Sequence, residues 1–525
     1  MNANHATPRF VLTLLLAWLL AACASPTPIP TPPVLNIPSP PASEGASGEG
    51  AAPTTAAVPT LPPSETTAAT AGATPTAEAS PTPEEALPTA TAAPTPATNP
   101  AVQSTTTGLP PISQDLYLLA QGSLVRWNHL TGQIETLLAG ADPASRVQDP
   151  ENPVANFVGD ITHVAISPDG QRATAARLTS QEQTRQPDEA LGFDRLLLYQ
   201  QHQILFVDLV SGEQWVMVPR ADNVQGVAIS PNAERVAFVA SGLSGETTPT
   251  APEETAQVMH VLTTGGGSGA GAPQAVGTCV VGCFGPLWHL ESNLLVWADH
   301  AALWLFNTAA SQPEKLLDHR YNENDIEWYW PVAWANNGRY LLLDEFRFES
   351  QSSAVYDVPS QTLLAVPNTG NFITPYPTEV QWMPDDRLLI ARSNPQPQLE
   401  LWRVDLDGRT AIQEETRVVG ATGQGLIGAR HLTDGRFAFA LSTAEASAGT
   451  YLLTSLSEEP LRVNGIPPTS PADPFAVPHV LWAADGSGAW VSTSTAAYYA
   501  PASGGALCEI SAVWGYGVVQ TTVWR

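Results

Sequence analysis

The chain has 525 residues, of which 22 are basic and 50 are acidic, and its formal net charge is −28. This acidity excludes a nucleic-acid binder, because neutralising phosphates requires clustered Lys and Arg side chains. The length allows about three or four ordinary domains, or one large repeat domain and an additional segment. No Lys or Arg lies between Val11 and Val125, so the chain consists of unlike parts that must be interpreted separately.

The N-terminal 22 residues have the pattern of a secretory signal. Arg9 precedes the apolar run Phe10–Leu20, and two alanines separate this run from Cys23. The run is too short to cross a bilayer, which takes about 20 apolar residues. The sequence Leu-Ala-Ala-Cys resembles the signal of bacterial lipoproteins, and this resemblance implies cleavage before Cys23 and lipidation of its thiol. We therefore expect an extracytoplasmic protein that its N-terminal lipid anchors to the membrane.

Residues 23–112 are predicted to form a lipidated cysteine followed by a disordered tether. Positions 24–112 hold 21 of the 49 prolines and no aromatic residue, and the rest is mostly Ala, Thr, Ser and Gly. Such a segment buries too little apolar area to offset the entropy of ordering it. A fully extended proline-rich chain of this length would reach roughly 280 Å, at ~3.1 Å per residue. The tether would hold a domain away from the membrane.

The remainder, residues 113–525, contains one repeat. Short runs of β-branched and aromatic residues alternate with Gly, Pro, Asn and Asp turns. His163–Gly170 has the sequence HVAISPDG, and Gly226–Ala233 has the sequence GVAISPNA. The other units begin at Gly285, Pro331, Glu379, Gly428 and His479. The aligned turn residues are Asp169, Asn232, Glu291, Asn337, Asp385, Asp434 and Asp485.

Each unit predicts four short strands, which is the content of one propeller blade. The S-P-D-G turn between apolar strands resembles TolB-like and WD-repeat-like bacterial β-propellers, and the resemblance implies an all-β propeller over residues 113–525. Seven units begin at Ile161, and residues 116–133 resemble the last three strands of one more. The strand Gly517–Trp524 could complete that blade, which gives about eight blades closed by pairing of the N- and C-terminal strands. Seven blades are the alternative, if one C-terminal unit is degenerate.

The aligned bulky residue of each inner strand is expected to pack between neighbouring blades. These residues are Ile166, Ile229, Trp288, Trp334, Trp382, His431 and Trp482. The long connections are expected on one face of the ring and include Ala141–Asp160, Leu178–Asp194, Ser241–Ala256 and Asp318–Trp330. Long loops gathered on one face suggest that this face binds a ligand.

Two groups on that face are candidate ligand-binding residues. Trp328, Tyr329 and Trp330 could stack on a sugar or anchor a peptide, or they could fill the space between blades. His163, Glu379 and His479 begin inner strands and would surround the mouth of the central channel. They could act as metal ligands or as acid and base groups, or could simply be hydrated. We predict no metal site and no cofactor.

Three cysteines remain once Cys23 is assigned to lipidation. Cysteines outside the cytoplasm tend to pair. Cys279 and Cys283 could form a disulfide that closes a small ring, or one of them could pair with Cys508 across blades and leave one free thiol.

The chain has no motif for a catalytic nucleophile, a zinc-dependent hydrolase or a phosphate-binding loop. We therefore predict a non-catalytic protein- or peptide-binding scaffold of the cell envelope. It would be held at the membrane by its lipid, with an envelope protein or peptide as partner and no nucleic acid. The alternatives are a glycan-binding module that uses Trp328 and Trp330, and an enzyme with a site at the channel mouth.

Overall fold

The computed structural model describes most of the chain from residue 109 onward. The described residues are 109–147, 155–188, 193–243, 256–267, 269–279, 282–322, 325–348, 350–372, 376–443, 448–467, 477–493, 496–510 and 519–524. The predicted signal, Cys23 and the tether as far as residue 108 lie outside these ranges. Within them, no helix is long and apolar enough to cross a membrane.

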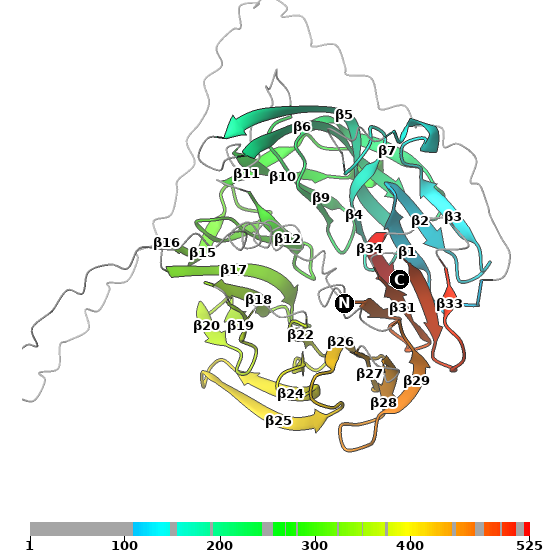
Figure 1. The fold of residues 1–525 in the computed structure, drawn as a ribbon. Helices are drawn as coiled ribbons and strands as arrows, with labels where there is room; N and C mark the ends of the chain where they lie inside the picture. Colours follow the sequence, from blue (N-terminus) through cyan, green and yellow to red (C-terminus); the bar gives the residue numbers. More distant parts are fainter. Residues whose placement is uncertain are drawn as a thin grey trace, which may run out of the picture. The chain divides into compact units, whose positions relative to one another are not determined.

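The described strands form eight antiparallel sheets that stand around a ring (Figure 1), which we number as blades 1–8 along the chain. Blade 1 contains β1 (Leu116–Ala120), β2 (Ser123–Trp127), β3 (Ile134–Leu138) and the C-terminal β34 (Val519–Trp524). Blade 2 contains β4 (Ile161–Ile166), β5 (Arg172–Asp188), β6 (Phe193–Asp208) and β7 (Gln214–Asp222). Blade 3 contains β8 (Gly226–Ile229), β9 (Arg235–Ala240), β10 (Gln257–Thr263) and β11 (Gln274–Cys279). Blade 4 contains β12 (Phe284–Trp288), β13 (Leu294–Ala298), β14 (Ala302–Asn307) and β15 (Glu314–Asp318).

The second half of the ring follows the same plan. Blade 5 contains β16 (Arg320–Asn322), β17 (Asp325–Trp334), β18 (Tyr340–Arg347), β19 (Ser350–Asp357), β20 (Thr362–Ala365) and β21 (Asn371–Phe372). Blade 6 contains β22 (Glu379–Trp382), β23 (Leu388–Arg392), β24 (Gln398–Asp405) and β25 (Thr410–Val418). Blade 7 contains β26 (Gly425–His431), β27 (Phe437–Ser442), β28 (Gly449–Leu453) and β29 (Leu461–Gly465). Blade 8 contains β30 (His479–Trp482), β31 (Gly488–Ser492), β32 (Ala497–Pro501) and β33 (Cys508–Glu509).

The predicted all-β propeller of eight blades is therefore confirmed, and so is its closure. The C-terminal β34 pairs antiparallel with β1, so that Leu116 lies opposite Trp524 and Tyr117 lies opposite Val523. In Figure 1 the red C-terminal strand lies beside the blue strands of blade 1.

The repeated turn explains why the sequence pattern is so regular. In blade 2 the Asp169 carboxylate accepts a hydrogen bond from the Gln171 backbone N–H at 3.0 Å, and Gly170 takes a φ of 70°. Asp or Asn side chains at this position cap their own turn, and the next residue must tolerate a positive φ. In blade 4, Glu291 occupies the Asp position, and its backbone N–H is instead 3.2 Å from the His289 ring nitrogen.

The core consists of one apolar cluster at each junction between neighbouring blades. Ile166 packs between blades 1 and 2, Trp288 between blades 3 and 4, and Trp482 between blades 7 and 8. The last junction joins blade 8 to blade 1, where Trp490 and Tyr499 meet Trp127 and Trp524. The predicted packing of the aligned bulky residues between blades is confirmed at these positions.

Blade 2 has longer strands than the other blades and blade 5 has additional strands, and both extend on the face that was predicted to carry the long loops. The segment Leu178–Asp194 was predicted as a loop, but β5 and β6 stay paired from Arg172 opposite Asp208 to Asp188 opposite Phe193. The segment Asp318–Trp330 was also predicted as a loop, but it contains β16 and the start of β17. Figure 1 shows β5, β6 and β17 as long ribbons.

The open question of cysteine pairing has one answer in the structure. Cys279 and Cys283 form a disulfide with a Cα–Cα distance of 5.5 Å, and Cys508 is a free, partly buried thiol. The disulfide joins the last residue of β11 to the residue before β12, so it closes the connection between blades 3 and 4.

Candidate functional site: an aromatic surface on blades 4 and 5

The extension of blade 5 brings the predicted tryptophans into two successive rows across three strands. Trp328 on β17 lies opposite Phe346 on β18, which lies opposite Gln351 on β19. In the next row Trp330 lies opposite Asp344, which lies opposite Ser353. Directly opposite residues of an antiparallel sheet share a face. The two rings therefore stand on one face of blade 5 together with polar side chains.

These rings join aromatic side chains of blade 4 in a continuous cluster. The Trp330 ring stacks on Phe284 with centroids 4.9 Å apart and contacts Phe346 at 4.5 Å. The Trp328 ring contacts His300 at 4.7 Å. We name the cluster the aromatic surface, and its members are Phe284, His300, Trp328, Trp330 and Phe346. All five side chains are half-buried.

The close approach of the two blades at this point depends on Gly285. Its φ is 62°, and a Cβ atom there would lie 3.3 Å from the Pro331 ring. Trp330 also packs against the core cluster between blades 4 and 5. The aromatic surface thus combines two predicted roles, because its rings fill space between blades while parts of them stay accessible.

Tyr329 lies apart from its two neighbours in sequence. Adjacent residues of a strand point to opposite faces, and Tyr329 is 5% exposed within the core cluster between blades 4 and 5. Its backbone N–H lies 3.2 Å from His319 Nε2, and its hydroxyl lies 3.5 Å from Glu345 Oε1. The structure therefore gives Tyr329 a structural position, and only Trp328 and Trp330 are accessible.

Ion pairs on β17 and β18 lie on the opposite face of the sheet from the aromatic surface, which is the face of Tyr329. Glu327 pairs with Arg320 and, at 2.9 Å, with Arg347. Arg347 also pairs with Glu345 at 2.6 Å, and the Ser352 hydroxyl donates to Glu345 at 2.6 Å. The arginines lower the pKa of Glu327, although burial opposes them. The charges on the Tyr329 face therefore compensate one another.

Asp344 is the titratable group on the face of the sheet that carries the aromatic rings, directly opposite Trp330. Burial raises the pKa of its carboxyl to about 7, and a hydrogen bond from Gln351 opposes this shift. A carboxyl whose pKa is raised by its surroundings and that stands beside accessible rings marks a candidate functional position. It would present a neutral, hydrogen-bonding group at slightly acid pH and a charge at alkaline pH.

The raised pKa of Asp344 gives a test of this environment. The folded-state pKa lies above the unfolded-state value of 3.8, so the stabilising contribution is complete below about pH 3.8 and is lost progressively as the pH rises to about 7. We expect Asp344→Asn to raise the melting temperature clearly more at pH 8 than at pH 5. Asp407→Asn, at an exposed position, is the control. Identical profiles for Asp344→Asn and the wild type between pH 5 and pH 8 would contradict the assignment.

The three residues predicted at the channel mouth begin β4, β22 and β30 or lie close to the start of these strands. Burial lowers the pKa of His163 to about 4, and its Nδ1 lies 3.0 Å from the Thr162 hydroxyl. In the described part of the chain, no three His, Cys, Asp or Glu side chains gather closely enough to hold a metal ion. His163, Glu379 and His479 therefore do not form a joint metal site there.

Glu379 has a specific structural task instead. Its Oε1 accepts a hydrogen bond from the Gly428 N–H at 2.9 Å, and its Oε2 accepts one from the Ala429 N–H at 2.8 Å. Burial raises the pKa of this carboxyl, and the two backbone donors oppose the shift. Both oxygens thus join the inner strand of blade 6 to that of blade 7.

We expect Glu379→Gln to destabilise the ring by about 1–3 kcal/mol, because an amide offers only one acceptor oxygen to two buried N–H groups. The free energy of unfolding in urea measures this loss. Glu291→Gln, at an exposed turn position, is the matched control and should have little effect. An unchanged unfolding midpoint for Glu379→Gln would contradict the proposed role.

Phe284, His300, Phe346 and Asp344 are members or neighbours of the site that the sequence did not indicate. Phe346 and Asp344 alternate along β18 in the same way as Trp328 and Trp330 along β17, and this shared period of two was the available signal. Phe284 and His300 come from another blade, and nothing in the sequence relates them to Trp328.

No protein-family model matches the sequence, and no curated protein matches it. Several solved structures are similar at low identity. Dipeptidyl peptidase 4 of Porphyromonas gingivalis is 10% identical with a TM-score of 0.44, over 76% of this chain and 57% of the peptidase. An oligogalacturonate lyase in complex with manganese is 10% identical with a TM-score of 0.37, over 75% of this chain and 84% of the lyase. TolB from Acinetobacter baumannii is 13% identical with a TM-score of 0.30, over 58% of this chain and 65% of TolB. Similarity at this level does not define an activity for this chain.

Proposed function

We propose that this chain is a non-catalytic binding protein of the cell envelope, anchored by a lipid at Cys23, that recognises a protein or peptide partner. The observation that carries the proposal is the aromatic surface, with polar side chains in the same cross-strand rows. Accessible tryptophans are enriched in the cores of protein interfaces and often contribute much of the binding energy. The rings already pack against the fold, so a partner could use them without first ordering them.

Photo-crosslinking in native envelopes tests this proposal. Phe348 is 63% exposed and follows β18 directly, so a photoreactive phenylalanine analogue there would lie beside the aromatic surface. We expect a discrete adduct with a protein partner, which mass spectrometry would identify. The same analogue at Leu130, which is 82% exposed in a turn on the opposite face, is the control.

The combined substitution of Trp328→Ala and Trp330→Ala should abolish the adduct at position 348. Circular dichroism and the melting temperature must show that this variant still folds, because Trp330 also packs in the core. The proposal is contradicted if the analogue at position 348 gives no adduct in native envelopes, or gives an adduct that the double substitution does not change.

Glycan binding is the second candidate, and one observation favours it. Asp344 and Gln351 lie in the same cross-strand rows as Trp330 and Phe346. Polar groups beside an accessible ring can bind the hydroxyls of a sugar while the ring stacks on its apolar face. Retention of the purified chain on immobilised envelope polysaccharide, lost in both Trp328→Ala and Trp330→Ala, would favour this function over the first.

An enzyme at the channel mouth is the third alternative, and the site geometry gives it less support. Both Glu379 oxygens accept backbone hydrogen bonds within the ring. Both oxygens of the carboxylate are therefore already engaged in linking two blades.

A further inference from the structure

We propose that the open edge of β5 between Leu178 and Asp188, together with the adjacent cavity at Phe157 and Val158, binds an extended polypeptide segment by strand addition. One apolar side chain of that segment would occupy the cavity. The inference rests on the proposed function of a protein- or peptide-binding scaffold, and it specifies the mode and the place of binding.

The first step is that β5 continues beyond its inner neighbour. The pairing of β4 with β5 ends at Ile161 opposite Arg177. Two backbone bonds from the preceding loop extend it by one residue, from Gly159 N–H to Leu178 O at 2.7 Å and from Leu178 N–H to Asp160 O at 2.8 Å. Between Leu178 and the end of β5 at Asp188, no described strand other than β6 pairs with β5.

The second step fixes where the backbone groups of β5 point. The Gln200 backbone N–H donates to the Asn223 side-chain oxygen at 2.8 Å, and the Gln200 carbonyl accepts from the Asn223 N–H at 2.8 Å. Both groups of Gln200 therefore point away from β5. Gln181 lies directly opposite Gln200. Directly opposite residues of an antiparallel pair either exchange hydrogen bonds or both turn outward, so the N–H and C=O of Gln181 point away from β6.

The same geometry applies to Gln183, two residues further along β5. Among the described residues, no backbone partner meets the N–H or C=O of Gln181 or Gln183. Four backbone groups in a row on a strand edge form a template for another strand. The chemistry that matches alternating N–H and C=O groups at this spacing is the backbone of an extended polypeptide.

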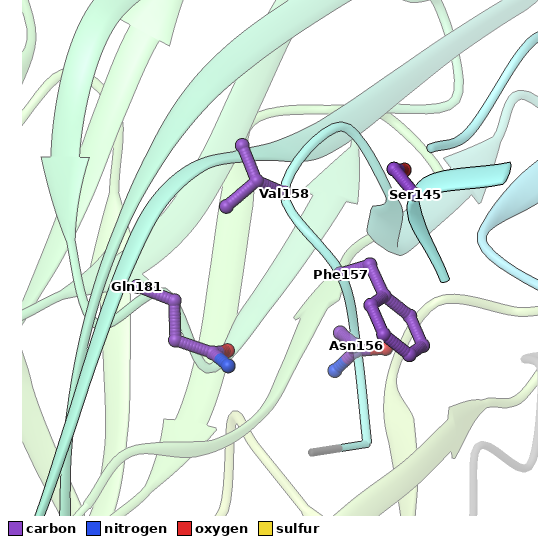
Figure 2. Close-up of a pocket in the computed structure, with 5 residues that line it drawn as sticks. All are labelled: Ser145, Asn156, Phe157, Val158 and Gln181. Carbon is purple, nitrogen blue, oxygen red and sulfur yellow. The ribbon is translucent and has the colours of Figure 1, made fainter. Parts of the chain in front are cut away.

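The third step is the cavity beside this edge, which Figure 2 shows. It has a volume of about 270 Å³. Its lining residues are Ser145, Asn156, Phe157, Val158 and Gln181. Gln181 therefore belongs both to the open edge and to the cavity wall, and its side chain extends from β5 toward the loop that carries the other residues.

The size and chemistry of the cavity fit a side chain better than a small molecule. Small-molecule sites usually measure roughly 300–1,000 Å³. The Val158 side chain is 54% exposed, although it is apolar. The nearby Arg146 lies over the Phe157 ring at 5.2 Å and pairs with Asp160, so its charge is already compensated. An apolar side chain from a bound strand would cover Val158 and Phe157.

A selection with a library of linear dodecapeptides displayed on phage, against the purified chain, tests the proposal. We expect the enriched peptides to share one large apolar residue within a stretch of β-forming residues. Their affinity, measured by fluorescence anisotropy with labelled synthetic copies, should fall at least tenfold for Val158→Asp and for Gln183→Pro. Val210→Asp changes another valine, 72% exposed in a turn on the opposite face, and should leave affinity unchanged.

Gln183→Pro removes an outward N–H and so spares the ladder with β6. If this variant fails to fold, the affinity of the peptides for Val158→Asp, and the affinity of peptides methylated on backbone nitrogens for the unmodified chain, still test the proposal. Unchanged binding to both variants, or no enriched peptide, would overturn the proposal. Peptides that lose affinity only for the combined Trp328→Ala and Trp330→Ala variant would also overturn it, while leaving the proposed function intact. A dimer that Gln183→Pro converts to a monomer would identify a second copy of this chain as the occupant, which also overturns it.

Discussion

Deletion of residues 519–525 is expected to abolish cooperative folding of the ring. The deletion removes β34, which is the inner strand of blade 1 and pairs along β1 from Leu116 to Ala120. It also removes buried side chains from two blade junctions. Val523 is 3% exposed in the cluster between blades 1 and 2, and Trp524 is 6% exposed in the cluster between blades 8 and 1. A single short strand therefore supports both neighbours of blade 1.

The point variant Trp524→Ala separates packing from strand pairing. Its indole N–H donates to the Leu481 carbonyl of blade 8 at 3.0 Å, so the substitution removes both a buried ring and a link between blades. We expect a loss of about 3–5 kcal/mol in the free energy of unfolding. Leu461→Ala, at a position that is 68% exposed, should cost far less. A truncated chain that unfolds cooperatively at the wild-type denaturant midpoint would contradict the role of β34.

Glu400→Ala is expected to have the second large effect. The Glu400 side chain is fully buried in blade 6. Its Oε1 accepts from Arg392 Nε at 2.5 Å, and its Oε2 accepts from the Trp402 indole N–H at 2.7 Å. Removing the carboxylate leaves a largely buried guanidinium and a buried indole N–H without their acceptor. Breaking a buried ion pair in this way typically costs about 3–5 kcal/mol.

Glu414→Ala is the matched control for Glu400→Ala. Glu414 lies on the outer strand of the same blade and pairs with Arg387 at 3.3 Å and with Arg403 at 3.0 Å. Pairs near the surface contribute only about 0–1 kcal/mol, so denaturation in guanidinium should distinguish the two variants clearly. Replacing Glu400 and Arg392 together by leucine should restore part of the loss. Equal destabilisation by Glu400→Ala and Glu414→Ala would show that burial of the pair is unimportant.

The blade pattern could be predicted from the sequence because the physics of each turn is local. Asp169 and Gly170 are neighbours within one tight turn, and the positive φ after the aligned turn residue recurs in every unit. The closing strand was predictable for a related reason, since β1, β2 and β3 lacked an inner partner and residues 517–524 had no other place.

The ribbon of β5 and β6 was not predictable as strands. Residues such as Glu182, Thr184 and Gln186 are exposed, and beyond Leu178 β5 carries polar residues on both faces, so it shows no alternation of apolar and polar residues. Hydrophobic periodicity reports burial of one face, not hydrogen bonding. The extension of blade 5 escaped prediction because its rings pack with residues of blade 4 that are about 30–45 positions away in sequence.

The candidate site, like the fold, could be predicted only in part from the sequence. The sequence indicated Trp328 and Trp330, but it could not separate them from Tyr329. The register of β17 with β18 determines which of these side chains point into the core and which stay accessible. Glu379 looked accessible because inner strands line a channel. The N–H groups that donate to its carboxylate come from Gly428 and Ala429, about 50 residues away. Only the packing of neighbouring blades brings these groups close to Glu379.

The pairing of β1 with β34 has a consequence for how the protein is made. Residues 116–120 leave the ribosome about 400 residues before their partner strand, so blade 1 stays incomplete throughout synthesis. Contacts of such large sequence separation form slowly, because the loop must close before it is stabilised. Blades 2 to 8 can assemble in order as an open arc during translation, whereas the last step joins the two ends of that arc. Factors that delay this step would leave β1 as an unpaired edge and favour aggregation.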